Sequence, residues 1–324
     1  MQFLSKAKPL AEQIPEPVGK AMSWFPYSWR LGPDYRRTRQ QMDSFTRLDD
    51  VKKKDWVFQK TKNIVEWARD AHPFYRSFYK QQQCNKKISN FDDIKSHPIV
   101  SKSDLQAIPL NDRTAFEKGS YLINTGGTSG QPLAFYLDAG AFAREWAHMH
   151  FIWEKLDYQT KDIKLTLRGK NLGNRPLVYN PVHNEYLVNA YKPYNEVAEA
   201  LWEKMKKNEI RFLHGFPSAI FDFIIYCRDH QSVIIDKLSG SLKGILFGSE
   251  YPAPVYREPV EQCLGVDSIS WYGHSEFAIL AYEVEKYIYT PLHTYGFAEA
   301  VPCAEGHRLV CTGYYNRVCP FIRY

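Results

Sequence analysis

A glycine- and hydroxyl-rich run at residues 124–132 is the clearest candidate for chemistry in this sequence. It reads Asn-Thr-Gly-Gly-Thr-Ser-Gly-Gln-Pro, and the hydroxyls of Thr125, Thr128 and Ser129 can donate to phosphate oxygens. Its glycines let the backbone approach a ligand closely and present N–H groups as an anion-binding nest. No Gly-Lys-Ser/Thr follows, so the run is not a P-loop. Taken alone, such a loop more often forms a plain hairpin.

Three further polar motifs begin where strands are predicted to end. They are His-Gly-Phe-Pro-Ser at 214–218, Gly-Ser-Glu at 248–250 and Tyr-Gly-His-Ser-Glu at 272–276. The carboxyl ends of parallel strands meet at one edge of a sheet, where ligands bind. A tyrosine face can stack on a base, a carboxylate can hold Mg²⁺, and the glycine loop can hold polyphosphate. Together these motifs predict an ATP site.

Each motif also has an ordinary structural explanation. Tyr272 could be a buried aromatic of the sheet, and Glu276 could be a surface carboxylate. Phe216 and Pro217 could simply start a helix. All of these ordinary explanations would have to hold at once for there to be no ATP site. The occurrence of the motifs together, in this order, therefore favours the ATP site.

The elements that would position these motifs alternate between strands and helices. Apolar runs predict strands at 163–167, 210–213, 242–247 and 268–272, and helical periodicity predicts helices at 196–207, 217–228 and 254–264. The glycine-rich loop joins predicted strands at 121–123 and 133–137, and 279–284 and 308–312 give the chain a β-rich end. This pattern predicts an α/β fold of mostly parallel sheets flanked by helices.

The first 90 residues are expected to form an N-terminal arm with helices, and residues 91–324 the nucleotide-binding body. Residues 1–50 show weak periodicity and suggest an irregular arm. Residues 55–83 suggest two helices interrupted at Pro73. Ser101 or Ser103 is expected to cap a short helix.

Composition excludes several classes of protein. The 42 basic and 36 acidic residues give a net charge of +6, and no basic motif interleaved with aromatics indicates nucleic-acid binding. The basic clusters at 36–39 and 52–54 are typical of a solvated helix face, with contact to an anionic membrane surface as the alternative. The six cysteines form no CxxC pair, which favours reduced thiols in a cytoplasmic protein. We expect no secretory signal and no spanning helix.

The ordered motifs resemble the adenylate-forming (acyl-CoA synthetase-like) superfamily, in particular the phenylacetate–CoA ligase-like branch with its CapK-type members of capsular polysaccharide biosynthesis. The phosphate loop of that family is similar to residues 125–132, and its Tyr-Gly-x-Ser/Thr-Glu motif to residues 272–276. The resemblance extends to residues 98–105, 167–169 and the final Pro-Phe-Ile-Arg-Tyr at 320–324. It therefore covers the chain from about residue 91 to its end.

The resemblance implies roles for individual residues. The residues that wrap the ATP phosphates would be Thr125, Gly126, Gly127, Thr128, Ser129 and Gly130. Ser249 and Glu250 would flank the adenine, with Tyr272 stacked on it, and Gly273 would also belong to the nucleotide-binding residues. Glu276 would ligate Mg²⁺ and, with Thr128, act in catalysis. The carboxylate pocket would be lined by His214, Gly215, Phe216 and Pro217.

Two departures from the family pattern bear on activity. Gln131 stands where the family has a lysine, so one positive contact to phosphate is missing. In the family, Arg-Tyr is followed by Thr-Gly-Asp, a hinge and a small C-terminal domain with a catalytic lysine. The sequence ends at Tyr324, so the resemblance predicts that this chain lacks that lid domain, binds ATP weakly, and adenylates poorly or not at all.

The implied function is ATP-dependent activation of a small-molecule carboxylate as an acyl-adenylate. Transfer would follow to CoA or to an amine or hydroxyl of a saccharide, in surface polysaccharide biosynthesis. Aromatic residues at 146–153 and 214–221 would suit an apolar or aryl acid. The alternatives are a non-catalytic nucleotide- or acyl-binding homologue acting with a partner, and an interaction protein of a polysaccharide assembly at a membrane.

Overall fold

The chain folds into two compact units. The computed structural model describes residues 16–22, 25–84, 86–126 and 132–324. The first unit comprises the described residues up to 33 together with 149–272 and 282–289, and the second comprises 34–148, 273–281 and 290–324. In the described part of the chain, no helix is both long and apolar enough to cross a membrane.

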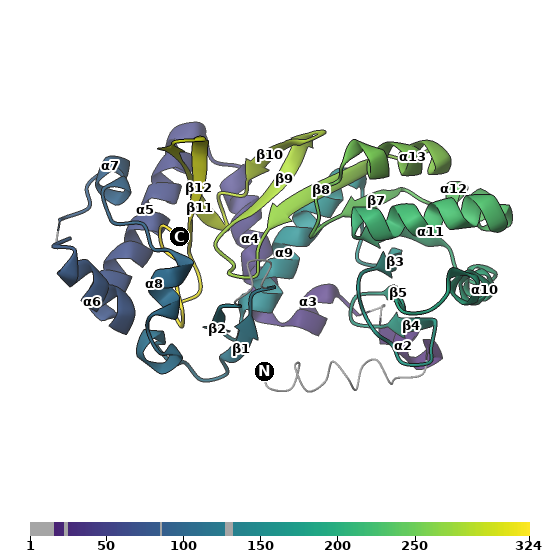
Figure 1. Ribbon diagram of the computed structural model, residues 1–324, viewed down its shortest axis with the longest axis horizontal. Helices are drawn as coiled ribbons and strands as arrows, with labels where there is room; N and C mark the ends of the chain where they lie inside the picture. The colour runs from purple at the N-terminus through teal and green to yellow at the C-terminus, as the bar shows by residue number, and fades with distance from the viewer. Residues whose placement is uncertain (1–15, 23–24, 85, 127–131) are drawn as a thin grey trace. The chain divides into compact units, whose positions relative to one another are not determined.

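The first unit contains most of an eight-stranded sheet with the order β10-β9-β8-β7-β6-β3-β5-β4 (Figure 1). Its parallel strands are β3 (Ile163–Leu167), β5 (Glu185–Val188), β6 (Ile210–Gly215), β7 (Gly244–Phe247) and β8 (Ser268–Gly273). At one edge, β4 (Leu177–Asn180) is antiparallel to β5. At the other, β9 (Leu280–Glu285) and β10 (Ile288–Pro291) complete the sheet.

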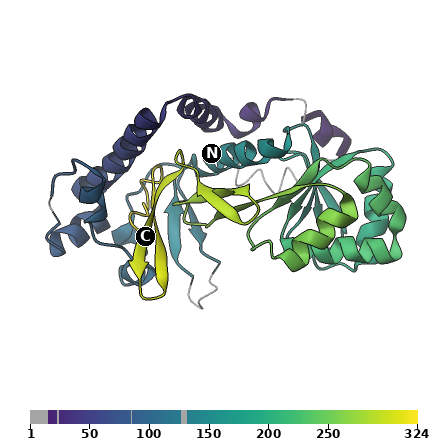
Figure 2. The same cartoon turned by 90° about the horizontal axis from the view of Figure 1, so that it is seen from above.

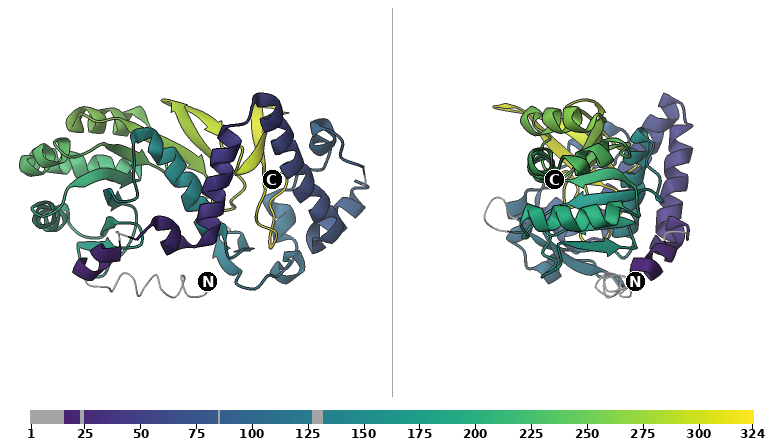
Figure 3. Two further views of the ribbon diagram at one scale, coloured as in Figure 1. Left: turned by 180° about the vertical axis from the view of Figure 1, so that it is seen from behind. Right: turned by 90° about the vertical axis from the view of Figure 1, so that its right-hand side faces the viewer.

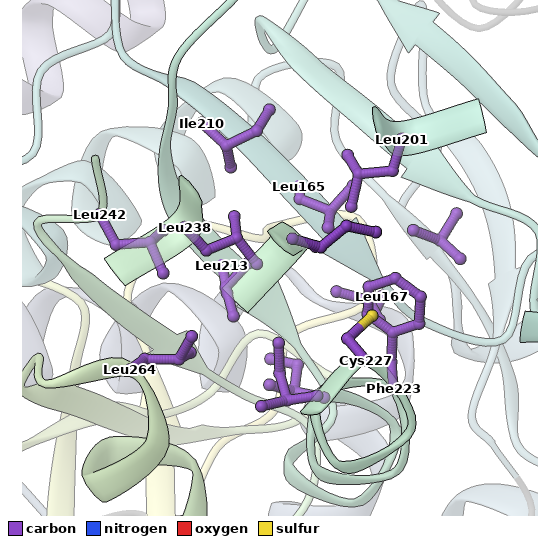
Figure 4. Packing of buried hydrophobic residues seen from close by; sticks show 14 of the residues in the cluster. Leu165, Leu167, Leu201, Ile210, Leu213, Phe223, Cys227, Leu238, Leu242 and Leu264 are labelled. Atoms are coloured by element: carbon purple, nitrogen blue, oxygen red, sulfur yellow. The ribbon is translucent and has the colours of Figure 1, made fainter. Parts of the chain in front are cut away.

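One face of this sheet is covered by a layer of helices (Figures 1 and 2). The layer consists of α10 (Tyr194–Met205), α11 (Pro217–His230), α12 (Ser232–Ser239) and α13 (Pro254–Leu264). Side chains alternate between the two faces of a strand, and Leu165, Leu167 and Leu213 point toward the helices. They pack with apolar helix residues such as Phe223 in a core whose members are at most 9% exposed (Figure 4). The unit also contains α2 (Glu16–Met22) and α3 (Tyr27–Leu31).

The second unit is built from helices and two hairpins. Its helices are α4 (Pro33–Thr46), α5 (Asp50–Ala71), α6 (Pro73–Gln81), α7 (Phe91–Lys95) and α8 (Lys102–Gln106), and Figure 3 shows α4 and α5 from behind as successive purple helices. One antiparallel hairpin pairs β1 (Tyr121–Asn124) with β2 (Ala134–Leu137), and the other pairs β11 (Gly296–Cys303) with β12 (Gly306–Gly313). Val65, Tyr75 and Phe135, each 0% exposed, lie in its separate apolar core. The helix α9 (Ala141–Trp153) begins in this unit and ends in the first.

Most predicted elements are confirmed, and the α/β architecture with a largely parallel sheet is observed. The break at Pro73 separates α5 from α6, and Ser101 caps α8 by accepting a hydrogen bond from Asp104 N. The prediction of an irregular arm is wrong for the described residues between 16 and 46, which are largely helical. The β4–β5 hairpin was not predicted, because its two four-residue strands are too short to show a clear period.

Candidate functional site

Three motifs meet at the carboxyl edge of the first unit's sheet. β6, β7 and β8 are adjacent and parallel, with Gly215 opposite Phe247 and Phe247 opposite Ser270. Gly248 N donates to Gly215 O at 3.1 Å just beyond these pairs. The structure therefore brings together the starts of the three motifs that the sequence placed at strand ends.

Two glycines in these motifs are required by the space around them. Gly215 has φ of +148°, and a Cβ atom there would lie 1.8 Å from Leu167 O. A Cβ atom on Gly248 would lie 2.2 Å from Trp271 Nε1. A side chain at position 215 would push β6 away from β3, whereas one at position 248 would displace the Trp271 indole. Gly215 therefore sets the close spacing of these two strand ends, and Gly248 makes room for Trp271.

Phe216 and Pro217 begin the helix α11, as their ordinary structural explanation suggested. Phe216 is the N-cap and Pro217 the first helical residue, where the missing N–H of proline costs nothing. Glu250 Oε2 accepts hydrogen bonds from Ser218 N at 3.0 Å and from Ser218 Oγ at 2.8 Å. Glu250 thus ties the loop after β7 to the start of α11. Ser249, the residue before it, has a left-handed φ of 64°.

Tyr272 lies at the end of β8 with 47% of its surface exposed. A buried sheet aromatic would be nearly inaccessible, so this explanation is wrong for Tyr272. Its ring has open surface on which a planar group can stack.

His214 is buried beside these loops, with only 6% of its surface exposed. Its imidazole packs edge-on against the ring of Trp153, with 4.9 Å between centroids. Burial, together with the nearby Arg168 cation, lowers the pKa of His214 to about 3, so the imidazole is neutral at physiological pH.

In the second unit, Thr125 pairs with Leu133 just beyond the paired ends of β1 and β2. Thr125 N donates to Leu133 O at 3.0 Å, and Thr125 Oγ1 accepts from Leu133 N at 2.9 Å. These bonds extend the β1–β2 hairpin by one pair and leave Gly126 exposed at its end. The predicted phosphate-loop residues Gly127, Thr128, Ser129 and Gly130 lie outside the described residues.

Glu276 also lies in the second unit and is a largely buried carboxylate, with 12% of its side chain exposed. Its Oε2 lies 3.2 Å from His274 Nδ1 and accepts from Ser275 Oγ at 3.2 Å, while Oε1 accepts from Tyr324 Oη at 3.3 Å. Burial acts to raise the pKa of Glu276, but the His274 and Ser275 contacts outweigh it and hold the pKa below its ordinary value. The surface-carboxylate explanation is therefore wrong for Glu276, which is ionised and partly enclosed.

An ionised carboxylate of this kind fits Mg²⁺, which is usually held by one or two carboxylates together with phosphate oxygens and water. Among the residues described, no group of three or more His, Cys, Asp and Glu side chains is arranged to hold a metal. A Mg²⁺ ion at Glu276 would need further ligands, such as phosphate oxygens and water.

The final motif and the run at 98–105 meet in the second unit. Val100 N donates to Arg323 O at 2.9 Å, and the Arg323 guanidinium forms a buried ion pair with Glu299 at 3.0 Å. Tyr324 N donates to Cys311 O at 2.9 Å, which holds Tyr324 beside β12. Two motifs of the resemblance thus support the position from which Tyr324 contacts Glu276.

The predicted site residues fall into two groups, one in each unit. The first unit holds His214, Gly215, Phe216, Pro217, Ser249, Glu250 and Tyr272, and the second holds Thr125, Gly126, Gly273 and Glu276. The sequence reasoning missed a set of buried polar residues behind His214: Lys164, Thr166, Asn180 and Glu185. The alternation Ile-Lys-Leu-Thr-Leu in β3 was the available signal, because it places Lys164 and Thr166 on one face.

The comparisons with known proteins agree with this architecture. No protein-family model matches the chain. Protein CapK of Staphylococcus aureus is 22% identical over 283 residues, which cover 82% of this chain and 60% of that protein. The chain thus spans about 60% of the length of the curated relative that it matches.

Solved structures of 2-hydroxyisobutyryl-CoA ligase share the fold. The open conformation in complex with 2-HIB-AMP and CoA has a TM-score of 0.63 at 16% identity, covering 85% of this chain and 69% of that one. The thioesterification state has a TM-score of 0.64 at 17% identity, covering 85% and 63%. The chain therefore shares the fold of these CoA ligase structures, and the expected similarity to CapK is found in its sequence.

Proposed function

We propose that this chain provides the nucleotide- and acid-binding body of an ATP-dependent carboxylate-activating enzyme. The observation that carries the proposal is the junction of the β6, β7 and β8 ends, where His214, Glu250 and the exposed ring of Tyr272 share one sheet edge. This is where ligands bind in open α/β sheets. The fold shared with 2-hydroxyisobutyryl-CoA ligase supports the same assignment.

Within this proposal, each predicted residue has one task. Tyr272 stacks on the adenine, which Ser249 and Glu250 border, and Gly273 also contributes to nucleotide binding. Residues 125–130 bind the phosphates, and Glu276 holds Mg²⁺. The acid occupies a pocket lined by residues 214–217.

The reaction joins a carboxylate oxygen of the acid to the α-phosphorus of ATP. The bond from that phosphorus to the bridging oxygen breaks, and pyrophosphate leaves with the electron pair. Negative charge grows on the phosphoryl oxygens, so hydrogen-bond donors such as the Thr128 hydroxyl would accelerate the step. Mg²⁺, when bound, neutralises phosphate charge.

The acceptor that we favour for the acyl group is the thiol of CoA, because 2-hydroxyisobutyryl-CoA ligase was crystallised with an acyl-AMP and CoA. An amine or hydroxyl of a saccharide, in surface polysaccharide biosynthesis, is the second acceptor class. Supplying each acceptor to the enzyme charged with acyl-adenylate distinguishes them, because only the true acceptor accelerates AMP release.

Calorimetric titration with a non-hydrolysable acyl-sulfamoyl adenosine tests the site. We expect this acyl-adenylate mimic to bind the chain at least about 100-fold more tightly than AMP, because it occupies both the nucleotide and acid positions. Tyr272→Ala should weaken mimic binding by about 10- to 100-fold, as expected for loss of one base-stacking ring.

Tyr191→Ala is the matched control, since Tyr191 is also in the first unit and is 70% exposed. It should leave binding unchanged. Failure of the mimic to bind, or equal losses in the two variants, contradicts the proposed site.

A further inference from the structure

A buried polar cluster lies behind His214 on the sheet face opposite α10–α13. Lys164, Thr166 and Glu185 are each 0% exposed, and Asn180 is 3% exposed. Parallel pairing sets Lys164 beside Glu185 and Thr166 beside His214. Burying a carboxylate in this way is costly unless charge partners and hydrogen bonds compensate.

The ionised carboxylate of Glu185 determines which of its neighbours donate hydrogen bonds. Asn180 Nδ2 donates to Oε1 at 2.9 Å, and Thr166 Oγ1 lies 2.7 Å from Oε2. Burial acts to raise the pKa of Glu185, but the charges of His183, Lys164 and Arg168 outweigh it and hold the pKa well below its ordinary value. An ionised carboxylate only accepts hydrogen bonds, so the Thr166 hydroxyl must donate to it.

Because its hydrogen points to Glu185, the Thr166 hydroxyl oxygen can only accept a hydrogen bond from His214. Its Oγ1 lies 3.4 Å from His214 Nδ1. A hydroxyl that has given its hydrogen to Glu185 can interact favourably with Nδ1 only if Nδ1 carries the ring proton. The chain Glu185–Thr166–His214 therefore selects one tautomer of the neutral imidazole.

The other ring nitrogen is then a lone-pair acceptor at the site. His214 Nε2 makes no hydrogen bond to any described residue, and His214 retains 6% of its surface exposed at the carboxyl end of β6. The edge-on contact with Trp153 restrains the ring plane. Nε2 is thus a hydrogen-bond acceptor held in a restrained orientation at the carboxyl end of β6.

Building on the proposed function, we propose that Glu185 acts through Thr166 to hold His214 as the Nδ1–H tautomer, so that Nε2 accepts a hydrogen bond from the acid substrate. The substrate is then a carboxylic acid that carries its own O–H or N–H donor, such as a hydroxy acid, rather than a plain hydrocarbon acid. Thr166 and Glu185 are positioning residues in this scheme, and His214 determines specificity.

Imidazole ¹⁵N spectra of the full chain test the tautomer without any turnover. Selective histidine labelling, with His214→Phe to assign the signals, should show a protonated Nδ1 and an unprotonated Nε2. Thr166→Val removes the hydroxyl at nearly constant volume and should abolish this fixed tautomer. Thr61→Val, at another 0% exposed threonine, is the control and should leave the His214 signals unchanged. A protonated Nε2 in the unaltered chain overturns the proposal.

Pairs of near-isosteric acids test the specificity. In carboxylate-dependent pyrophosphate exchange, 2-hydroxy-2-methylpropanoate is compared with 2,2-dimethylpropanoate, and 4-hydroxyphenylacetate with 4-methylphenylacetate. Of the two hydroxyl acids, the one with the higher kcat/KM should exceed the methyl acid of its pair at least about 10-fold in kcat/KM. The methyl acid has no O–H group to donate and leaves Nε2 unpaired. Thr166→Val should reduce that ratio, mainly by raising KM for the hydroxyl acid.

The two failures are distinguishable. Exchange at equal kcat/KM within both pairs overturns the inference about the substrate and leaves the proposed function standing. No exchange with any acid, together with no binding of the acyl-adenylate mimic, overturns the proposed function.

Discussion

At the scale of single residues, the candidate site depends on close backbone packing as much as on polar side chains. Gly215 and Gly248 lie where the strand ends of the first unit approach one another, and each faces an atom that a Cβ would strike. Tyr272 and the His214 imidazole depend on this spacing, because both lie on or beside the same strands. The packing of the strands therefore explains why glycine is needed at these two positions, independently of any ligand.

Gly215→Ala should destabilise the first unit by about 3 kcal/mol, because the added methyl meets Leu167 O and the backbone must leave its positive φ. Urea denaturation followed by circular dichroism measures this change. Gly240→Ala is the matched control, since Gly240 has a right-handed helical φ of −76° and its nearest contact would be an ordinary 3.5 Å. Equal stability of the two variants contradicts this reading.

The roles of single residues could be predicted from sequence only in part. The motif order placed His214, Glu250 and Tyr272 at strand ends, because strand ends can be recognised from apolar runs. The partner of Glu250 could not be predicted, since Ser218 is 32 residues away and their contact depends on the pairing of β6 with β7. For the same reason, sequence alone did not connect Glu185 to His214.

At the scale of elements, the start of α11 connects fold and site. Phe216 and Pro217 begin the helix without a side-chain cap of their own, and Glu250 supplies the missing acceptor from the loop after β7. One carboxylate therefore fixes both the helix start and the loop that we assign to the adenine.

Glu250→Ala should lower the free energy of unfolding by about 1 kcal/mol, the usual cost of losing an N-terminal cap. Glu250→Gln keeps an acceptor oxygen and should lose less. Chemical denaturation of both variants, free of nucleotide, measures the effect. A loss in Glu250→Gln as large as in Glu250→Ala would show that the charge, rather than the hydrogen bonds to Ser218, is what matters.

Element types were predictable where the hydrophobic period was long. The helices α5, α10, α11 and α13 and the parallel strands of the sheet follow from it. The described helices between residues 16 and 46 were missed because packing, rather than a strong intrinsic pattern, stabilises them: Tyr27, Leu31 and Met42 are each at most 4% exposed. The β4–β5 hairpin was missed because its strands are short.

At the scale of the whole molecule, each unit has its own apolar core. Leu165, Leu213 and Phe223 belong to the core of the first unit, and Val65, Tyr75 and Phe135 to that of the second. This division could not be read from the sequence, because the chain passes between the units several times. Sequence patterns report local periodicity and carry little information about such crossings.

Buried histidines should make the second unit sensitive to acid. Burial lowers the pKa of His72 to about 4 and that of His148 to about 4. Both values lie below the ordinary pKa of about 6.5, so the unfolded chain binds more protons at pH 4–6.5. The contribution of these two histidines to stability is therefore fully present above about pH 6.5 and is lost as the pH falls toward their pKa in the folded state.

Lowering the pH from 7.5 to 5.5 should reduce the free energy of unfolding by about 1.3 kcal/mol for each of these histidines. Urea denaturation at the two pH values measures the change. His148→Gln removes one titrating group and should make the fall in the free energy of unfolding about 1.3 kcal/mol smaller than in the unaltered chain. A fall of equal size in the variant and in the unaltered chain contradicts the titration of a buried His148.

Carboxylate-dependent exchange of labelled pyrophosphate into ATP tests the central claim most directly, because it requires the reversible formation of an acyl-adenylate. With a panel of hydroxy and hydrocarbon acids and Mg²⁺, we predict exchange above the acid-free rate for at least one acid. Glu276→Gln, which loses the carboxylate assigned to Mg²⁺, should reduce that exchange at least about 100-fold. Tight binding of the acyl-adenylate mimic without exchange for any acid would contradict carboxylate activation by this chain and identify it as a binding homologue.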